Sequence, residues 1–243
     1  MCTVTFIPSR NNIFLTSNRD EKKLRATAVY PKEYEFPTGR IFFPKDQDAG
    51  GTWVSAHENG NAIVFLNGGV VAHTPRPPYR KSRGLILLDL INNNHPFHAF
   101  RMLDLHGIEP FTAIIWDDGE LYECRWDGTD RHVHARDTIT PHIWSSVTLY
   151  TPEIIAKRES WFSEWLAGNP APTQEDVIQF HQFEGDGDSW NAFKMDRNGE
   201  TSTVSITSIA LGGHQTIMYY LDLKNNHSEI SEFAVKKNTV VLK

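Results

Sequence analysis

The stretch Met1-Cys2-Thr3-Val4-Thr5-Phe6 opens the chain, and Thr16-Ser17-Asn18-Arg19-Asp20-Glu21 follows it after a short interruption. Residues 2–8 and 13–17 alternate β-branched or aromatic side chains with others, which is the pattern of a β-strand. The polar residues 9–12 between them are typical of a turn. The two stretches therefore predict a β-hairpin with a cysteine at its start and a charged cluster at its end.

The register of this hairpin decides which side chain lies beside Cys2. A turn over residues 9–12 puts Cys2 opposite Arg19, and a tighter turn at residues 11–12 puts it opposite Glu21. Successive side chains of a strand point to opposite faces, so Arg19 and Glu21 share one face while Asn18 and Asp20 share the other. In both registers the charged cluster is within reach of the cysteine across the strand pair.

Composition narrows the class of protein and the kind of partner. The 243 residues suffice for one domain over residues 1–243 with a sizeable core, and we expect a single domain. A net charge of -6 argues against a nucleic-acid partner. Neither a membrane span nor a signal peptide is visible. Two cysteines, Cys2 and Cys124, cannot form a disulfide framework, which favours a reducing, cytoplasmic location.

The rest of the chain alternates blocks of strands with blocks of helices. Expected strands cover residues 41–43, 52–55, 62–66, 111–116, 120–126, 142–150, 202–211, 216–223 and 230–235. Expected helices start at residue 82 and cover residues 96–105, 151–166 and 173–180, and residues 73–81 form a proline-rich loop. Antiparallel strands with helices packed in separate blocks predict an α+β layered sandwich.

The second position gives Cys2 a particular chemistry. Aminopeptidase removes an initiator methionine when a small residue follows, so mature Cys2 is expected to carry both a thiol and a free α-amine. An amine with an ordinary pKa of about 8 can act as the base for its own thiol, which is how N-terminal nucleophiles work. A nearby cation such as Arg19 favours the thiolate, the reactive form of cysteine.

These motifs together resemble a known family. Met1-Cys2, residues 17–21, Gly50-Gly51-Thr52-Trp53 and Ser82-Arg83-Gly84 are similar to the NRDE family, also called the transport-and-Golgi-organisation protein 2 family. The resemblance is clear over roughly the first 85 residues. It implies the fold of the N-terminal nucleophile (Ntn) hydrolases, a four-layer αββα sandwich of two antiparallel sheets. The start of the chain is also similar to the choloylglycine and penicillin V acylases, which cleave linear amide bonds.

The resemblance implies roles for individual residues. Cys2 matches the acylase nucleophile, and Arg19, Asp20 and Glu21 belong to the charged cluster beside it. Counted from Cys2, the acylase arginine falls one position before Arg19. Asn67 falls where a family asparagine offers its amide to an oxyanion.

Three further residues are expected to bind substrate. They are Asn18, Trp53 and Arg83, and the basic stretch around Arg83 offers a place for an anionic group. The short histidine pattern at residues 132–134 and the acidic, glycine-rich residues 184–189 lack complete ligand sets, so we expect no metal and no cofactor.

The leading hypothesis is an amidohydrolase that acts on a non-peptide linear amide of a small acyl-type metabolite through a Cys2 thioester. The alternative is a non-catalytic protein that binds or carries haem or a lipid or acyl metabolite in an Ntn-type cleft. In both cases the partner is a small molecule, and the formation of a homo-oligomer stays open. The identity of the substrate depends on loops such as residues 73–81 and 184–193, whose shapes the sequence does not define.

Overall fold

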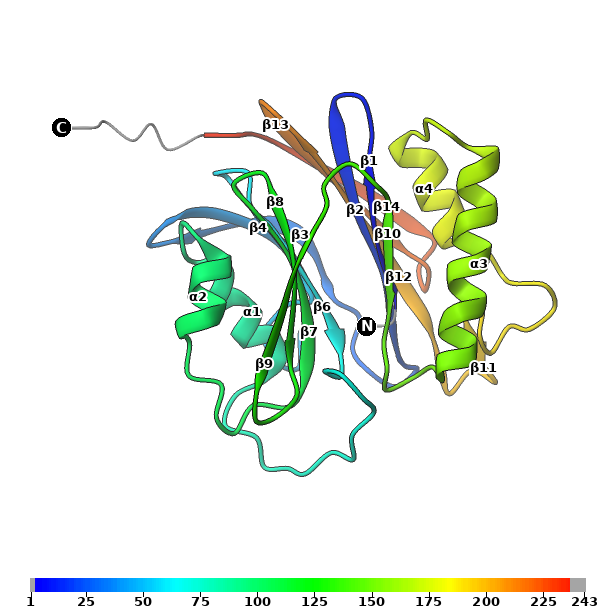
Figure 1. Ribbon diagram of the computed structural model, residues 1–243, viewed down its shortest axis with the longest axis horizontal. Coiled ribbons are helices and arrows are strands. Elements are labelled where there is room, and N and C mark those ends of the chain that lie inside the picture. The colour runs from blue at the N-terminus through cyan, green and yellow to red at the C-terminus, as the bar shows by residue number, and fades with distance from the viewer. Residues whose placement is uncertain (1–2, 237–243) are drawn as a thin grey trace.

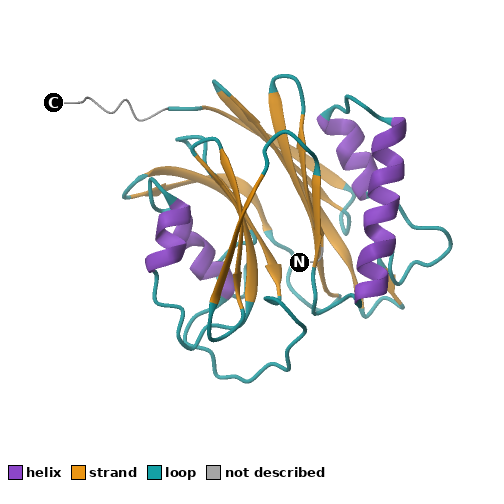
Figure 2. Ribbon diagram, viewed as in Figure 1, coloured by secondary structure: helices purple, strands orange, loops and turns teal. Residues whose placement is uncertain are grey.

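The computed structural model describes residues 3–236, and within them two antiparallel sheets stack face to face with helices on both outer sides (Figures 1 and 2). Each sheet has seven strands. This arrangement is the four-layer αββα sandwich that the family resemblance implies, and the α+β class predicted from the strand and helix pattern is confirmed.

The first sheet contains the amino-terminal hairpin and the carboxy-terminal strands, in the order β10-β1-β2-β12-β13-β14, with β11 beside β12. Its strands are β1 (Thr3–Pro8), β2 (Asn12–Lys22), β10 (His142–Ser145), β11 (Asp196–Arg197), β12 (Thr201–Gly212), β13 (Gln215–Asp222) and β14 (His227–Ala234). The hairpin strand β2 lies in the middle of this sheet, between β1 and β12.

The second sheet follows the chain order from β3 to β9 without a crossover. Its strands are β3 (Val29–Phe36), β4 (Gly39–Lys45), β5 (Val54–His57), β6 (Ala62–Asn67), β7 (Phe111–Asp117), β8 (Glu120–Trp126) and β9 (Arg131–Arg136). The helices are α1 (Arg83–Ile91), α2 (Pro96–Met102), α3 (Pro152–Gly168) and α4 (Gln174–His181).

Three apolar cores separate the four layers. The alternation of β1 explains how one strand serves two of them, because Val4 and Phe6 point into the core between the sheets. Ile7 points the other way, into the core under α3 and α4. The third core lies between the second sheet and α1 and α2, around residues such as Leu87 and Phe111. Period-2 alternation in the sequence therefore sets the layer order.

The structure corrects several predicted boundaries. Strand β2 does not end at Ser17 but continues through the whole charged cluster to Lys22. Strand β3 was not predicted, and the strand expected over residues 142–150 ends at Ser145. No helix within residues 3–236 combines the length and the apolar character that a bilayer crossing requires.

Candidate functional site

A cavity of 380 Å³ opens between the two sheets near the end of β2. It is lined by Arg19, Glu21, Arg25, Asp46, Ala49, Gly51, Thr52, Trp53, Phe65, Asn67, Tyr79, Lys81, Ser82, Arg83, Gly84 and Glu109. Five residues that the sequence analysis selected are among them: Arg19, Glu21, Asn67, Trp53 and Arg83. Residues from Arg19 to Glu109 in the chain thus line one cavity, and its volume is in the range expected for a small-molecule site.

The hairpin register places the charged cluster at the start of β1. Thr3 pairs with Asn18, so of the two predicted registers the one with the turn over residues 9–12 is correct. The proposed nucleophile, Cys2, lies outside the described residues. Its chain neighbour Thr3 is fully buried and lies beside the strand that carries Arg19.

The two faces of β2 perform different tasks. Asn18 points away from the cavity, and its side-chain amide donates to the carbonyl oxygens of His181 at 3.0 Å and Phe193 at 2.7 Å. Asp20 lies on the same face and accepts a hydrogen bond from the Thr203 hydroxyl at 2.6 Å. Both are buried, so the structure places neither of these two predicted site residues in the cavity.

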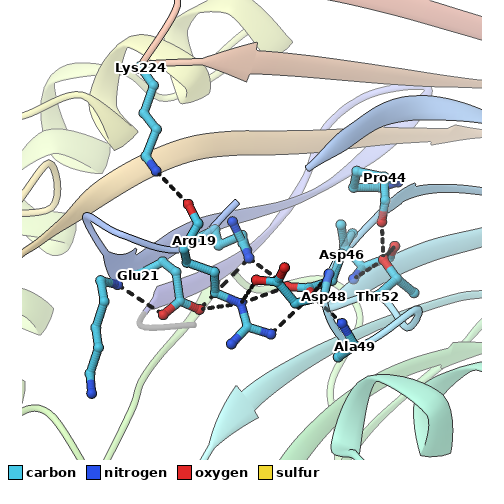
Figure 3. A network of polar contacts seen from close by, with 11 residues as sticks. Arg19, Glu21, Pro44, Asp46, Asp48, Ala49, Thr52 and Lys224 are labelled. Carbon is cyan, nitrogen blue, oxygen red and sulfur yellow. Dashed lines mark hydrogen bonds and ion pairs between the residues drawn. The ribbon is translucent and has the colours of Figure 1, made fainter. Parts of the chain in front are cut away.

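Arg19 points into the space between the sheets and is held from several sides (Figure 3). Its Nη2 atom lies 2.7 Å from Asp46 Oδ2 and 3.8 Å from Glu21 Oε2. The guanidinium carbon lies 4.5 Å from the ring centroid of Trp53, at a distance typical of a cation–π contact. These contacts fix the guanidinium in one position beside the cavity.

Asp46 is the centre of this cluster, and the sequence analysis did not select it. Arg25 binds it through Nε and Nη2, each at 3.0 Å, so one carboxylate serves Arg19 and Arg25. Burial alone would raise the pKa of Asp46, but the hydrogen bond from Arg25, the backbone N–H of Ala49 and the nearby cations outweigh it and lower the pKa below its ordinary value. Asp46 is therefore ionised at neutral pH.

A local signal for Asp46 does exist in the sequence. Its Oδ1 atom accepts the backbone N–H groups of Asp48 at 3.1 Å and Ala49 at 2.9 Å. An aspartate that binds the backbone two and three residues later is typical of a tight loop, here one that ends in Gly50-Gly51. The local signal predicts the loop, but the arginine partners come from β2 of the other sheet and from the segment that follows β2.

The opposite wall of the cavity is formed by the start of α1 and the loops around it. Arg83 Nη2 lies 3.2 Å from Glu109 Oε2, and burial lowers the pKa of Arg83. Lys81 pairs with Asp89. Two glycines bring this wall close, because a Cβ on Gly51 would lie only 2.4 Å from the Gly84 carbonyl carbon. The predicted Gly-Gly-Thr-Trp and Ser-Arg-Gly motifs therefore meet at backbone contact.

Asn67 ends β6 at the edge of the cavity. Its main-chain oxygen accepts a hydrogen bond from Ser146 Oγ at 2.8 Å. Within residues 3–236 no hydrogen bond joins its side-chain amide to another protein group, and Asn67 lines the cavity. Among the same residues, no three His, Cys, Asp or Glu side chains lie close enough together to hold a metal ion.

The sequence of this chain matches a known protein family. The family model for Transport and Golgi organisation 2 matches residues 1–179. This chain belongs to the Transport and Golgi organisation 2 family. The family assignment made from the Met-Cys, Asn-Arg-Asp-Glu and Gly-Gly-Thr-Trp motifs is confirmed. No curated protein matches the chain in sequence.

Solved structures of Ntn hydrolases share the fold of this family member. A mutant conjugated bile acid hydrolase from Clostridium perfringens aligns with a TM-score of 0.57 and 12% identity, over 98% of this chain and 97% of that chain. A Caenorhabditis elegans N-acylethanolamine-hydrolyzing acid amidase ortholog aligns with a TM-score of 0.60 and 10% identity, over 86% and 92% of the two chains. At these identities the likeness establishes an amidohydrolase-like fold and nothing about turnover.

Proposed function

We propose that this protein is an amidohydrolase that uses Cys2 as its nucleophile and cleaves a linear, non-peptide amide of a small acyl metabolite. The observation that carries the proposal is the convergence of Arg19, Glu21 and Asn67 on one cavity, next to the strand that Cys2 precedes. The mutant bile acid hydrolase lends support, because the residue replaced by alanine in it is also a cysteine at the second position.

The reaction begins when removal of Met1 frees the α-amine of Cys2. The amine takes the thiol proton while Sγ attacks the amide carbonyl carbon, and the carbonyl oxygen becomes an oxyanion. Collapse of this intermediate breaks the C–N bond, and the proton passes from the amine to the leaving nitrogen. Water then attacks the thioester, the C–S bond breaks, and the acid leaves as the thiol takes back a proton.

The described residues supply the other groups that this reaction needs besides the nucleophile. The side-chain amide of Asn67, which lines the cavity, donates to the oxyanion. Arg19 is held beside the strand by Asp46 and Trp53, and its positive charge favours the thiolate. Arg83, on the far wall, faces the part of the substrate that does not react.

The test combines intact mass with turnover of defined amides. Purified protein is incubated with an N-acyl glycine and an N-acyl ethanolamine of equal chain length, and free amine is measured while mass spectrometry follows acylation of Cys2. We expect a mature N-terminus at Cys2, an acyl adduct, and no product from Cys2→Ala. Asn67→Ala is expected to lower kcat by about 100-fold or more, since an oxyanion donor is lost.

A matched control keeps the result specific. Asn11 lies exposed in the β1–β2 turn, so Asn11→Ala should leave kcat unchanged. Retention of Met1 on all molecules, together with a thiol that shows no acylation by either amide, would overturn the proposal. Saturable binding of an amide without turnover would instead support the alternative of a carrier protein with the same cleft.

A further inference from the structure

Arg158 of α3 is fully buried, yet no carboxylate within residues 3–236 forms an ion pair with it. Burying a charge without an opposite charge costs free energy, and arginine is rarely fully buried unless it is paired. A methionine of similar length would fill the same space without that cost. Packing alone therefore does not explain the positive charge of Arg158.

The guanidinium joins three segments that are far apart in the sequence. Nη1 donates to the carbonyl oxygens of Asn191 and Ala192, both at 2.6 Å, and Nη2 donates to the Thr3 hydroxyl. Its guanidinium carbon also lies 4.3 Å from the ring centroid of Tyr150 and 4.4 Å from that of Phe193. Neutral oxygens and ring faces solvate the cation without neutralising it.

Thr3 is the residue directly after Cys2, so the cation is held at the start of β1. Consecutive Cα atoms are about 3.8 Å apart, so the residue that binds this cation is one peptide unit away from Cys2 in the chain. Both Thr3 and Arg158 are fully buried, and Coulomb interactions are stronger in a buried environment than in water.

One carboxylate, one further cation and a histidine lie around this position on the helix side of β1. Asp20 lies across Tyr150, whose hydroxyl donates to it at 3.4 Å, and Asp20 also accepts from Thr203. Arg197 lies 5.6 Å from the same tyrosine ring and adds a second positive charge. His181 contacts Thr5 of β1, and burial, followed by the charge of Arg158, lowers the pKa of His181 to about 3. On the cavity side, Arg19 is paired with Asp46 and Glu21.

We propose that Arg158 is a positioning residue for the amino-terminal end of β1, and that its uncompensated charge favours the thiolate and the neutral amine of the residue before Thr3. The inference rests on the proposed function, because an N-terminal nucleophile needs its amine neutral to act as a base. Arg158 would then assist from the helix side of β1 while Arg19 assists from the cavity side.

The test measures the reactivity of Cys2 and does not require turnover. The rate of alkylation by iodoacetamide is recorded between about pH 5 and pH 10 for the wild type, Arg158→Met and Arg158→Lys, and the rate for Cys2→Ala is subtracted. Cys124 adds little background, since it is fully buried and burial raises the pKa of its thiol. We expect the midpoint in Arg158→Met to rise by about one pH unit, which lowers the rate at pH 7 about tenfold.

Three variants besides Arg158→Met make the result specific. Arg158→Lys keeps the positive charge but loses the planar guanidinium that binds several partners at once. The midpoint of its alkylation profile should therefore lie between those of the wild type and Arg158→Met. Arg10→Met removes the same charge at the exposed far end of the hairpin and should leave the midpoint unchanged. If Arg158→Met does not fold, Thr3→Val removes the hydroxyl that binds Nη2, and its midpoint should rise by a smaller amount.

A folded Arg158→Met, or in its place a folded Thr3→Val, with the wild-type midpoint would overturn this inference. Failure of the proposed function has a different signature: the midpoint would still depend on Arg158 while neither amide was hydrolysed and no thioester formed. The two outcomes are therefore separable in the same set of proteins.

Discussion

Arg19 Nη2 lies 2.7 Å from Asp46 Oδ2, and this contact joins the central strand of the first sheet to the loop that leaves β4 in the second. Arg25 binds the same carboxylate from the segment that follows β2. Asp46 is thus the common anion of two arginines at the edge of the cavity. Its loss leaves the buried guanidinium of Arg19 with only one ion pair among residues 3–236, the longer contact to Glu21 at 3.8 Å.

The first prediction concerns this carboxylate. We expect Asp46→Asn to lower the free energy of unfolding by about 3 kcal/mol, because it removes the partner of a buried guanidinium. Asp48→Asn is the matched control. The Asp48 side chain is 54% exposed and contacts Arg25 only at 3.9 Å, so its loss should change stability by less than about 0.5 kcal/mol. Urea unfolding at pH 7 measures both, and equal midpoints for the two variants would contradict the prediction.

The same carboxylate predicts a pH dependence. The pKa of Asp46 is lower in the folded protein than the ordinary value, so the folded protein gives up its proton more readily. The stabilisation is complete above the unfolded pKa of about 4 and is lost as the pH falls through the folded pKa. The difference in stability between the wild type and Asp46→Asn should therefore shrink only below about pH 4.

The second prediction concerns the glycine contact behind the cavity wall. A Cβ on Gly51 would lie 2.4 Å from the carbonyl carbon of Gly84, and a backbone atom cannot move aside as a side chain can. We expect Gly51→Ala to destabilise the protein by about 1–3 kcal/mol and to separate the start of α1 from the Trp53 loop. Gly213→Ala is the control, since nothing lies within 4 Å of its Cβ position. Thermal unfolding that gave the two variants the same melting temperature would argue against a close contact.

The hairpin and the layers follow from local pattern, and this is why the sequence predicts them. Val4 and Phe6 alternate with Thr3 and Thr5, and that alternation assigns the faces of β1 without knowledge of its partners. The same alternation places Arg19 and Asn18 on opposite faces of β2. The alternation does not show which face of β2 lines the cavity. Asn18 was therefore expected to bind substrate, although its side chain lies on the helix side of the strand.

Other features depend on contacts between distant segments, which no local pattern contains. Asp46 binds two arginines only because the fold brings Arg19 of β2 and Arg25 of the following segment to the loop after β4. Strand β3 was missed because it is an edge strand, where Pro31 and exposed charged residues are tolerated. The burial of Arg158 likewise depends on how α3 packs on the first sheet. The single domain over residues 1–243 and the roles of the site residues stay predictions.

The third prediction separates a structural role for Asn18 from a substrate-binding one. Its amide donates to two buried carbonyl groups, and truncation leaves both without a partner. We expect Asn18→Ala to cost about 3 kcal/mol of stability, and Asn18→Asp to cost more, because a carboxylate cannot donate to carbonyl oxygens. Chemical unfolding measures the effect, with Asn11→Ala as the exposed control. A role in binding would leave stability intact and raise KM instead.

The last prediction concerns His181, which ends α4 and is fully buried against β1 and β2. The Nδ2 atom of Asn18 already donates to two carbonyl groups, so Asn18 Oδ1 accepts from His181 Nδ1–H. His181 Nε2, 2.7 Å from Thr5 Oγ1, is then the acceptor of the threonine hydroxyl. Both ring nitrogens are satisfied in the neutral form, and a second proton has no acceptor of its own.

Burial, assisted by the charge of Arg158, lowers the pKa of His181 to about 3, whereas the unfolded chain titrates near 6.5. Between these values the unfolded state binds a proton that the folded state does not, so stability falls as the pH is lowered. From pH 7 to pH 5 this group should remove about 2 kcal/mol of unfolding free energy. His181→Gln should be less stable at pH 7 but should lose this slope, whereas His214→Gln, at an exposed turn, should keep it. Urea unfolding at pH 7 and pH 5 measures the slopes, and parallel changes in the wild type and His181→Gln would show that His181 is protonated in the folded protein.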